Sequence, residues 1–212
     1  MEINKLPNEI AIFPLSNAVF FPRTVLPLNI FEERYLQLVE DCIKENRMFG
    51  MTQPKNKNTN FPDLYNVGCL GKITSFNETS DRRFIINLSG IIRFKIKDEL
   101  KTKKLYRKFK VGYEDFAEDL ELKYKKLENY NKNLLIKKIK LFFNKFNYPI
   151  EFSELAKLDV DQIVNSTCMI SPFTVEEKQK LVETVQIENK IKILEEIINF
   201  KLIDLQENRT IQ

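Results

Sequence analysis

The hydrophobic residues of this chain recur with two different periods, and the change between them near residues 113–118 most constrains its fold. Before that point, short apolar runs alternate with polar residues, as in half-buried β-strands. After it, apolar residues recur every three or four positions, as in amphipathic helices. The sequence shows no strand–helix–strand repetition of the kind that would indicate a parallel sheet. The pattern predicts an α+β protein, β-rich over 1–115 and α-helical over 116–212.

Prolines mark the first two expected strands, Ile10–Leu15 and Val25–Ile30. Pro14, Pro22 and Pro27 lie within or beside these runs. A proline cannot donate a ladder hydrogen bond, so these residues belong at sheet edges, bulges or strand starts. We therefore expect a strongly bent antiparallel or mixed barrel rather than a flat open sheet.

The rest of the β-rich part alternates between strand and turn signals. A helix is expected at 32–46, with its buried face formed by Tyr35, Leu36, Val39, Cys42 and Ile43. Further strands are expected at 48–53, 67–76, 82–89, 91–97 and 105–113. Gly90 is expected to separate two of them. Residues 54–62 hold two prolines and three asparagines and predict a surface loop.

The second part contains signals for four helices. The first spans 120–147, with candidate buried residues Leu127, Leu134, Leu135, Ile139, Phe142, Phe143 and Phe146. Two shorter helices open at capping boxes, Asp159 with Gln162 and Thr174 with Glu177, and Pro172 separates them. The last helix carries one apolar stripe, formed by Ile187, Ile191, Leu194, Ile198 and Leu205.

The composition excludes several classes of active site. The chain has no histidine, which removes Ser-His-Asp and Cys-His catalysis and histidine-containing zinc sites. Its three cysteines lie far apart, and its five glycines form no phosphate-binding motif. We expect no metal and no cofactor. Scattered thiols, with no targeting or membrane-spanning segment, indicate a cytoplasmic binding protein.

Positive charge gathers in the middle of the sequence. Residues 101–148 carry 14 basic and 6 acidic side chains, whereas the whole chain has a net charge of +4. Such a segment is either a solvated helix face or an attraction site for phosphate or an acidic partner. It therefore keeps nucleic-acid binding open as a second hypothesis.

Three blocks of sequence resemble a known family. The segment from Ile12, IFPLSNAVFFPRTVLPLNIFEERYLQLVEDCIKENRMFGM, resembles the opening of Lon substrate-binding domains, and especially the stand-alone bacterial proteins that carry this domain alone. LYNVGCLGKITSFNETSDRRFIINLSGIIRFKI is similar to the second β block, and SPFTVEEKQKLVETVQIENKIKILEEII to the closing helical segment. Arg23 stands where the family usually has glycine, and Glu33 where many members have proline.

The resemblance implies a PUA-like β pseudobarrel followed by an α-helical bundle subdomain. It also implies recognition of protein substrates, without the ATPase and Ser-Lys peptidase domains of Lon proteases. We therefore expect a non-enzymatic module that binds unfolded or hydrophobic polypeptide segments. An adaptor role in proteolysis or protein quality control follows, with a separate protease or chaperone as partner. The alternative is RNA or other nucleic-acid binding through the PUA-like barrel and the basic segment.

Six residues are candidates for contact with a peptide. Each also has an interpretation as a packing residue: aromatic rings at strand ends line either a binding surface or the core. Arg34 and Tyr35 either grip an extended peptide or fix the helix start. The candidates are Phe20, Phe21, Phe31, Arg34, Tyr35 and Phe76.

Overall fold

A computed structural model of the chain describes residues 2–16, 18–55, 62–121, 127 and 130–210, the last six by backbone alone. Two compact units follow each other in sequence, Met1–Leu122 and Lys123–Gln212, here called the N-terminal and C-terminal units. The predicted boundary at 115/116 falls within a 3-10 helix, Glu114–Leu120. Most of the loop predicted at 54–62, and part of the helix predicted from residue 120, lie outside the described residues.

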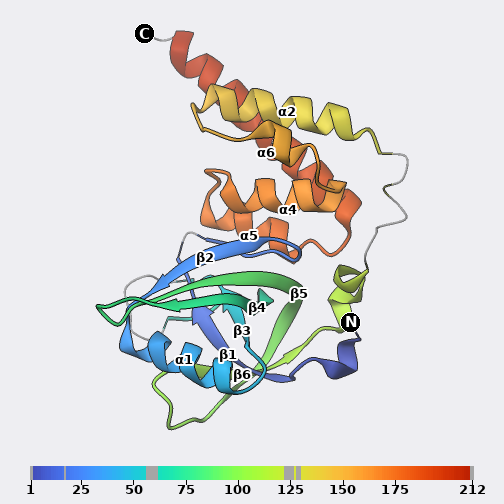
Figure 1. Ribbon diagram of the computed structural model, residues 1–212. Coiled ribbons are helices and arrows are strands. Elements are labelled where there is room, and N and C mark those ends of the chain that lie inside the picture. Colours follow the sequence, from blue (N-terminus) through green and yellow to red (C-terminus); the bar gives the residue numbers. More distant parts are fainter. Residues whose placement is uncertain (1, 17, 56–61, 122–126, 128–129, 211–212) are drawn as a thin grey trace. The chain divides into compact units, whose positions relative to one another are not determined.

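The N-terminal unit is a mixed sheet that closes on itself (Figure 1). In the described residues its strands are β1 (Glu9–Pro14), β2 (Val25–Ile30), β3 (Met48–Thr52), β4 (Val67–Glu78), β5 (Phe84–Leu100) and β6 (Arg107–Gly112). The sheet order is β2-β5-β4-β3-β1-β6, and a further β5–β6 pairing closes the barrel. Strands β1 and β3 are parallel, and the other pairs are antiparallel. The predicted α+β class and bent barrel are confirmed.

The prolines occupy positions where a missing donor costs little. Pro14 is the last residue of β1, and Pro22 precedes β2. Pro27 lies within β2, which pairs with β5 at one end of the sheet order. Proline is tolerated there because an edge strand has one side without a ladder partner.

Gly90 does not end a strand, so the prediction of two separate strands at 82–89 and 91–97 is wrong. Both belong to the single strand β5, and the β4–β5 register shifts beside Gly90, between Leu70 and Gly71. A Cβ atom at Gly90 would overlap the backbone carbonyl oxygen of Phe21. Glycine is needed here because the backbone at Phe21 approaches closely. A glycine in a sequence can mark either a turn or such a close approach, and its spacing from other residues does not distinguish the two.

Helix α1 (Glu33–Lys44) begins one residue after the predicted start. Its buried residues are Tyr35, Leu38, Val39 and Cys42, whereas Leu36 and Ile43 are half-buried. The predicted buried face was therefore wrong at Leu36 and Ile43 and omitted Leu38. Glu33 places a carboxylate in the first turn, where it interacts favourably with the helix dipole.

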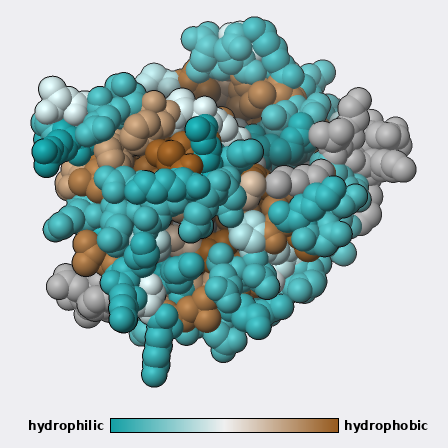
Figure 2. Space-filling model, turned by 60° about the horizontal axis from the view of Figure 1, so that its bottom comes forward, coloured by the Kyte–Doolittle hydropathy of each residue, from teal (hydrophilic) through white to brown (hydrophobic). Residues whose placement is uncertain are grey.

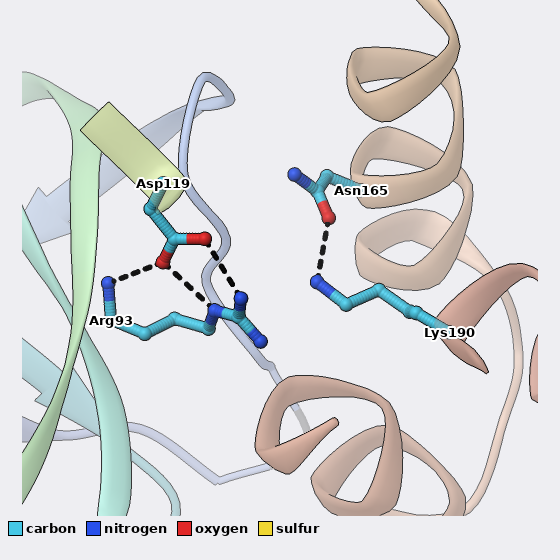
Figure 3. Close-up of polar contacts among 4 residues, drawn as sticks. All are labelled: Arg93, Asp119, Asn165 and Lys190. Atoms are coloured by element: carbon cyan, nitrogen blue, oxygen red, sulfur yellow. Dashed lines mark hydrogen bonds and ion pairs between the residues drawn. The ribbon is translucent and has the colours of Figure 1, made fainter. Parts of the chain in front are cut away.

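A buried ion pair ties β5 to the 3-10 helix after the barrel (Figure 3). Arg93 and Asp119 each expose 2% of their side chains. The Arg93 Nε and Nη2 atoms each donate to the Asp119 carboxylate at 2.8 Å, and the Arg93 backbone N–H donates to it at 3.0 Å. The guanidinium also lies 4.6 Å from the ring centroid of Phe116. These contacts satisfy both charges without water.

The C-terminal unit is built from helices that pack on the last one. Its helices in the described residues are α2 (Lys132–Lys145), α3 (Phe152–Leu155), α4 (Val160–Ile170), α5 (Val175–Glu183) and α6 (Ile187–Thr210). Helices α2, α4 and α5 each contact α6. Both predicted capping boxes are present. The α6 stripe is buried at Ile187, Ile191, Leu194 and Ile198, and the side chain of Leu205 lies outside the described residues.

Helix α2 is shorter than predicted because Asn131 caps its start. The Asn131 side chain accepts a hydrogen bond from the Leu134 backbone N–H, which satisfies one of the free donors of the first turn. Leu134 itself is 49% exposed, so its predicted burial is wrong. Polar contacts also join the α2 region to α6, since the Tyr130 hydroxyl donates to Glu195 of α6 and Lys138 forms an ion pair with it. Lys190 of α6 donates to Asn165 of α4 at 3.2 Å (Figure 3).

The backbone is strained at Arg23. Its φ angle is 60°, in the left-handed region that glycine adopts without steric cost. We expect Arg23→Gly to raise the free energy of unfolding by about 1 kcal/mol, measured by urea denaturation. Arg23→Ala is the control, because it removes the guanidinium but keeps Cβ. An equal gain in both variants would assign the effect to the side chain and contradict the backbone explanation.

Candidate functional site

A groove of about 490 Å³ lies between α1 and the end of the β4–β5 hairpin. The two elements that form it are seen at the same end of the N-terminal unit in Figure 1. The lining residues are Glu33, Leu36, Gln37, Glu40, Glu78, Arg82, Phe84 and Leu105. Its volume falls in the range of about 300–1,000 Å³ that is typical of ligand sites.

The α1 wall follows directly from helical spacing. Glu33, Leu36, Gln37 and Glu40 stand at positions i, i+3, i+4 and i+7, so they share one face of the helix. That face is offset from the buried face, which explains why Leu36 is half-buried rather than in the core. The helix thus packs one stripe on the barrel and presents another to the groove.

The apolar part of the groove comes from three separate segments. Leu36 belongs to α1, Phe84 opens β5, and Leu105 precedes β6. Phe84 is 5% exposed and Leu105 is 51% exposed. A partner side chain entering this groove would therefore meet a fixed aromatic ring and an exposed leucine.

Three polar contacts hold the Leu105 segment against α1. The Leu105 backbone N–H donates to the Gln37 side-chain oxygen at 2.8 Å. The Tyr106 hydroxyl donates to Asp41 Oδ2 at 2.9 Å, and Lys104 Nζ lies 2.9 Å from the same oxygen. The hydrogen bond from Lys104 is the main cause of a lowered pKa at Asp41, whereas burial raises the pKa of Tyr106. At neutral pH, Asp41 is thus ionised and Tyr106 is protonated, as these contacts require.

The rim of the groove is predominantly acidic. Glu33 and Glu40 line it from α1, and Glu78 lines it from the hairpin. Arg82 is the cation among these lining residues of the described chain. None of these four side chains forms an ion pair or hydrogen bond with another described residue.

Two of the candidate aromatic residues are exposed beside the groove. Phe76 is 44% exposed, and its ring centroid lies 4.9 Å from that of Phe84, which lines the groove. Phe31 is 64% exposed and follows Ile30, the register partner of Phe84. The packing interpretation of Phe31, as a residue buried in the core, is therefore wrong. A role for Phe31 and Phe76 in peptide contact stays a prediction.

Phe20 and Phe21 are buried in the N-terminal unit. Phe20 is 2% exposed and Phe21 is 0% exposed. The Phe20 ring fills the space above Gly71, and the Phe21 carbonyl oxygen accepts a hydrogen bond from the Thr24 hydroxyl. In this conformation their rings offer no surface to a peptide.

Arg34 and Tyr35 form a stack rather than an open site. The Tyr35 ring is 6% exposed and lies 4.2 Å from the Phe13 ring, while the Arg34 guanidinium lies 4.5 Å above Tyr35. Arg34 also donates to the Glu32 carboxylate at 2.8 Å, and burial raises the pKa of Tyr35. The cavity beside them holds only about 20 Å³, room for about one water molecule.

The described residues contain no group of three or more His, Cys, Asp or Glu side chains arranged to hold a metal ion. None of the three cysteines forms a disulfide, and all three are buried. Burial raises the pKa of Cys42 and of Cys168 to about 12. Within the described part of the chain, no helix has the length and apolar character needed to cross a membrane.

The basic segment 101–148 is divided between the two units. Its first part carries Lys104 and Arg107, which are paired with Asp41 and Glu99 in the N-terminal unit. The remainder includes α2 in the C-terminal unit. Nucleic-acid binding through this segment stays a prediction.

Sequence reasoning missed Leu36, Phe84 and Leu105 as site residues. Leu36 was assigned to the buried face of a helix, and Phe84 and Leu105 to the strands predicted at 82–89 and 105–113. The available signal was an apolar residue, Leu105, that directly follows a lysine-rich run, Lys101, Lys103 and Lys104. On the face drawn in Figure 2, hydrophobic surface forms separate brown areas within a mostly teal surface. On this face, a defined groove is therefore a better candidate site than a broad apolar patch.

Comparison with known families gives one match that covers most of the chain. The model described as "ATP-dependent protease La (LON) substrate-binding domain" matches residues 9–199. A Lon protease of Anaeromyxobacter dehalogenans is 26% identical over 94% of this chain and 24% of its own length. A Lon protease of Syntrophus aciditrophicus is 26% identical over 100% of this chain and 27% of its own. The chain thus spans about a quarter of the length of these relatives.

Solved structures agree with the fold. The N-terminal domain of a Mycobacterium avium complex Lon protease superposes with a TM-score of 0.63 at 11% identity, over 90% of this chain and 98% of that one. A Lon N-terminal domain protein from Xanthomonas campestris gives a TM-score of 0.61 at 18% identity, over 90% and 97%. Both have the architecture described above.

Proposed function

This chain belongs to the family of LON substrate-binding domains, and from that membership we propose that it binds unfolded polypeptide segments in the groove between α1 and the β4–β5 hairpin. The observation that carries the proposal is the apolar floor of the groove, made by Leu36, Phe84 and the exposed Leu105. Apolar side chains displayed by an unfolded chain would bury against this floor. A folded protein keeps such side chains inside, so it would not compete.

The proposed occupant is an extended segment with at least one large apolar side chain. The exposed ring of Phe76 contacts Phe84 in the groove, and the exposed Phe31 lies two residues before Glu33 at its rim. Both rings would extend the apolar surface available to that segment. Aromatic rings are suited to this role because they offer a large contact area at low conformational cost. Such recognition depends on apolar area rather than on one sequence.

The proposal includes a non-enzymatic role for the protein. The family matched is one of substrate binding, and the chain lacks histidine and any phosphate-binding glycine motif. Bound segments would be delivered to a separate protease or chaperone, so the protein would act as an adaptor in protein quality control. Three cysteines that form no disulfide support a reducing, cytoplasmic location.

Leu105→Glu tests the groove. The binding partner is a reduced and alkylated test protein that cannot refold, titrated by fluorescence anisotropy against its native form. We expect the full chain to bind the unfolded form and the variant to bind about tenfold or more weakly, because burying a leucine contributes about 1.5–3 kcal/mol. Leu105 is exposed, so the variant is expected to fold normally.

The matched control is Leu141→Glu, which makes the same change at a 59% exposed leucine on α2. It is expected to leave the affinity unchanged. Equal affinity of Leu105→Glu and the parent chain would overturn the groove as the site. Equal binding of the native and unfolded forms of the test protein would overturn the proposed selectivity.

A further inference from the structure

We propose that the groove selects polypeptide segments in which basic residues flank an apolar side chain. This inference rests on the proposed function and adds the chemistry of the occupant. It starts from three carboxylates that line the groove, those of Glu33, Glu40 and Glu78. Among the described lining residues, Arg82 is the one cation beside them.

These carboxylates have no partner within the described residues. Other acids nearby are already paired: Glu32 bonds Arg34, and Asp41 bonds Lys104 and Tyr106. The nearest basic residue in the Leu105 segment, Lys104, is therefore compensated. The negative charge left on the groove rim comes from side chains that are free to receive an external cation.

The geometry places charge and apolar contact at different distances from the bottom of the groove. Phe84 is buried at the base, while Glu33, Glu40 and Glu78 are exposed around it. A lysine or arginine on either side of an inserted apolar residue would reach the rim with its long flexible stem. The apolar contact then provides most of the affinity, and the rim provides the preference among segments.

The net charge of the molecule cannot explain a preference for basic segments. The chain carries a net charge of +4, so its overall charge opposes the approach of a basic peptide. A higher affinity for a basic segment must therefore come from a local cluster of carboxylates. The two exposed glutamates of α1 and the one on the hairpin form such a cluster at an apolar site.

Three labelled peptides test the inference by fluorescence anisotropy with the full chain. All contain Leu-Phe-Leu at the centre, flanked on each side by two lysines, two glutamines or two glutamates. We expect the lysine peptide to bind about tenfold more tightly than the glutamate peptide, with the glutamine peptide between them. Raising the salt concentration to 1 M is expected to reduce the difference, because exposed charges are screened.

Charge reversal locates the effect. Glu40→Lys and Glu78→Lys are expected to reduce the preference for the lysine peptide about threefold each, and the pair together to abolish it. Glu196→Lys is the matched control, because Glu196 is an exposed carboxylate of α6 without a described partner. It is expected to leave the preference unchanged.

The outcomes separate this inference from the proposed function. Equal binding of the three peptides, with loss of binding in Leu105→Glu, would overturn the charge preference and leave the groove as the binding site. A lysine preference that survives in the Glu40→Lys, Glu78→Lys double variant would also overturn it. Absence of binding by any peptide and by the unfolded test protein would overturn the proposed function itself.

Discussion

Replacing Arg93 with alanine is expected to lower the free energy of unfolding by about 3–5 kcal/mol, because it leaves the Asp119 carboxylate buried without its cation. Both side chains are 2% exposed, so water cannot replace the two guanidinium hydrogen bonds. The loss would also weaken the attachment of the 3-10 helix Glu114–Leu120 to β5, because the Arg93 contacts with Asp119 and Phe116 join the two elements. Only exposed ion pairs between β5 and this helix, Lys95–Asp115 and Lys97–Glu114, would be left among the described ion pairs. Urea denaturation followed by circular dichroism measures the change.

Two further variants separate burial from charge. Arg83→Ala breaks an exposed pair with Asp81, whose side chains are 50% and 55% exposed, and is expected to cost less than about 1 kcal/mol. The double variant Arg93→Met with Asp119→Leu removes both charges and is expected to recover most of the stability lost in Arg93→Ala. A cost below 1 kcal/mol for Arg93→Ala would contradict the role assigned to this pair.

Gly90→Ala is the second large effect that we expect, with a loss of about 3 kcal/mol. The added Cβ would overlap the Phe21 carbonyl oxygen, which is backbone and cannot rotate away. That oxygen also accepts a 2.7 Å hydrogen bond from the Thr24 hydroxyl, and the Arg23 N–H donates to the Gly90 carbonyl at 2.9 Å. Relieving the overlap would disturb the segment that leads into β2. Thermal unfolding measures the loss.

Gly112→Ala is the matched control for Gly90→Ala. Its added Cβ would meet the ends of the Glu114 and Lys97 side chains, which are exposed and free to move. We expect a loss below about 1 kcal/mol. If both alanine variants lost the same stability, a general effect of adding a methyl group to a strand would explain the loss. The backbone approach at Gly90 would then not be its cause.

Much of the fold was accessible from the sequence because local signals and tertiary structure agree. Pro27 correctly indicated a sheet edge, and the boxes at Asp159 and Thr174 correctly placed two helix starts. Pro14 ends β1, whereas an edge, a bulge or a strand start was predicted. Each of these signals acts within a few residues. Tertiary contacts did not need to override them.

The errors arise where a distant segment decides the outcome. Gly90 was interpreted as a strand end because glycine marks both turns and close backbone approaches, and only the position of Phe21 distinguishes them. Leu36 was placed on the buried face of α1 because a helix wheel does not show which stripe meets the barrel. Leu38 occupies that position instead.

The groove could not be predicted because it has no continuous sequence signature. Its residues come from 33–40, 78–84 and 105, and closure of the barrel brings these segments together. The exposure of Phe31 and Phe76 and the burial of Phe20 and Phe21 are likewise set by packing. Alternation alone gives each ring two possible environments.

The most direct test of the account is an NMR titration of the full ¹⁵N-labelled chain with the reduced and alkylated test protein. Binding in the groove predicts that the largest amide shifts occur at Leu36, Phe84 and Leu105, and that they vanish in Leu105→Glu. Largest shifts on α2 or elsewhere in the C-terminal unit, with these three amides unchanged, would contradict the account.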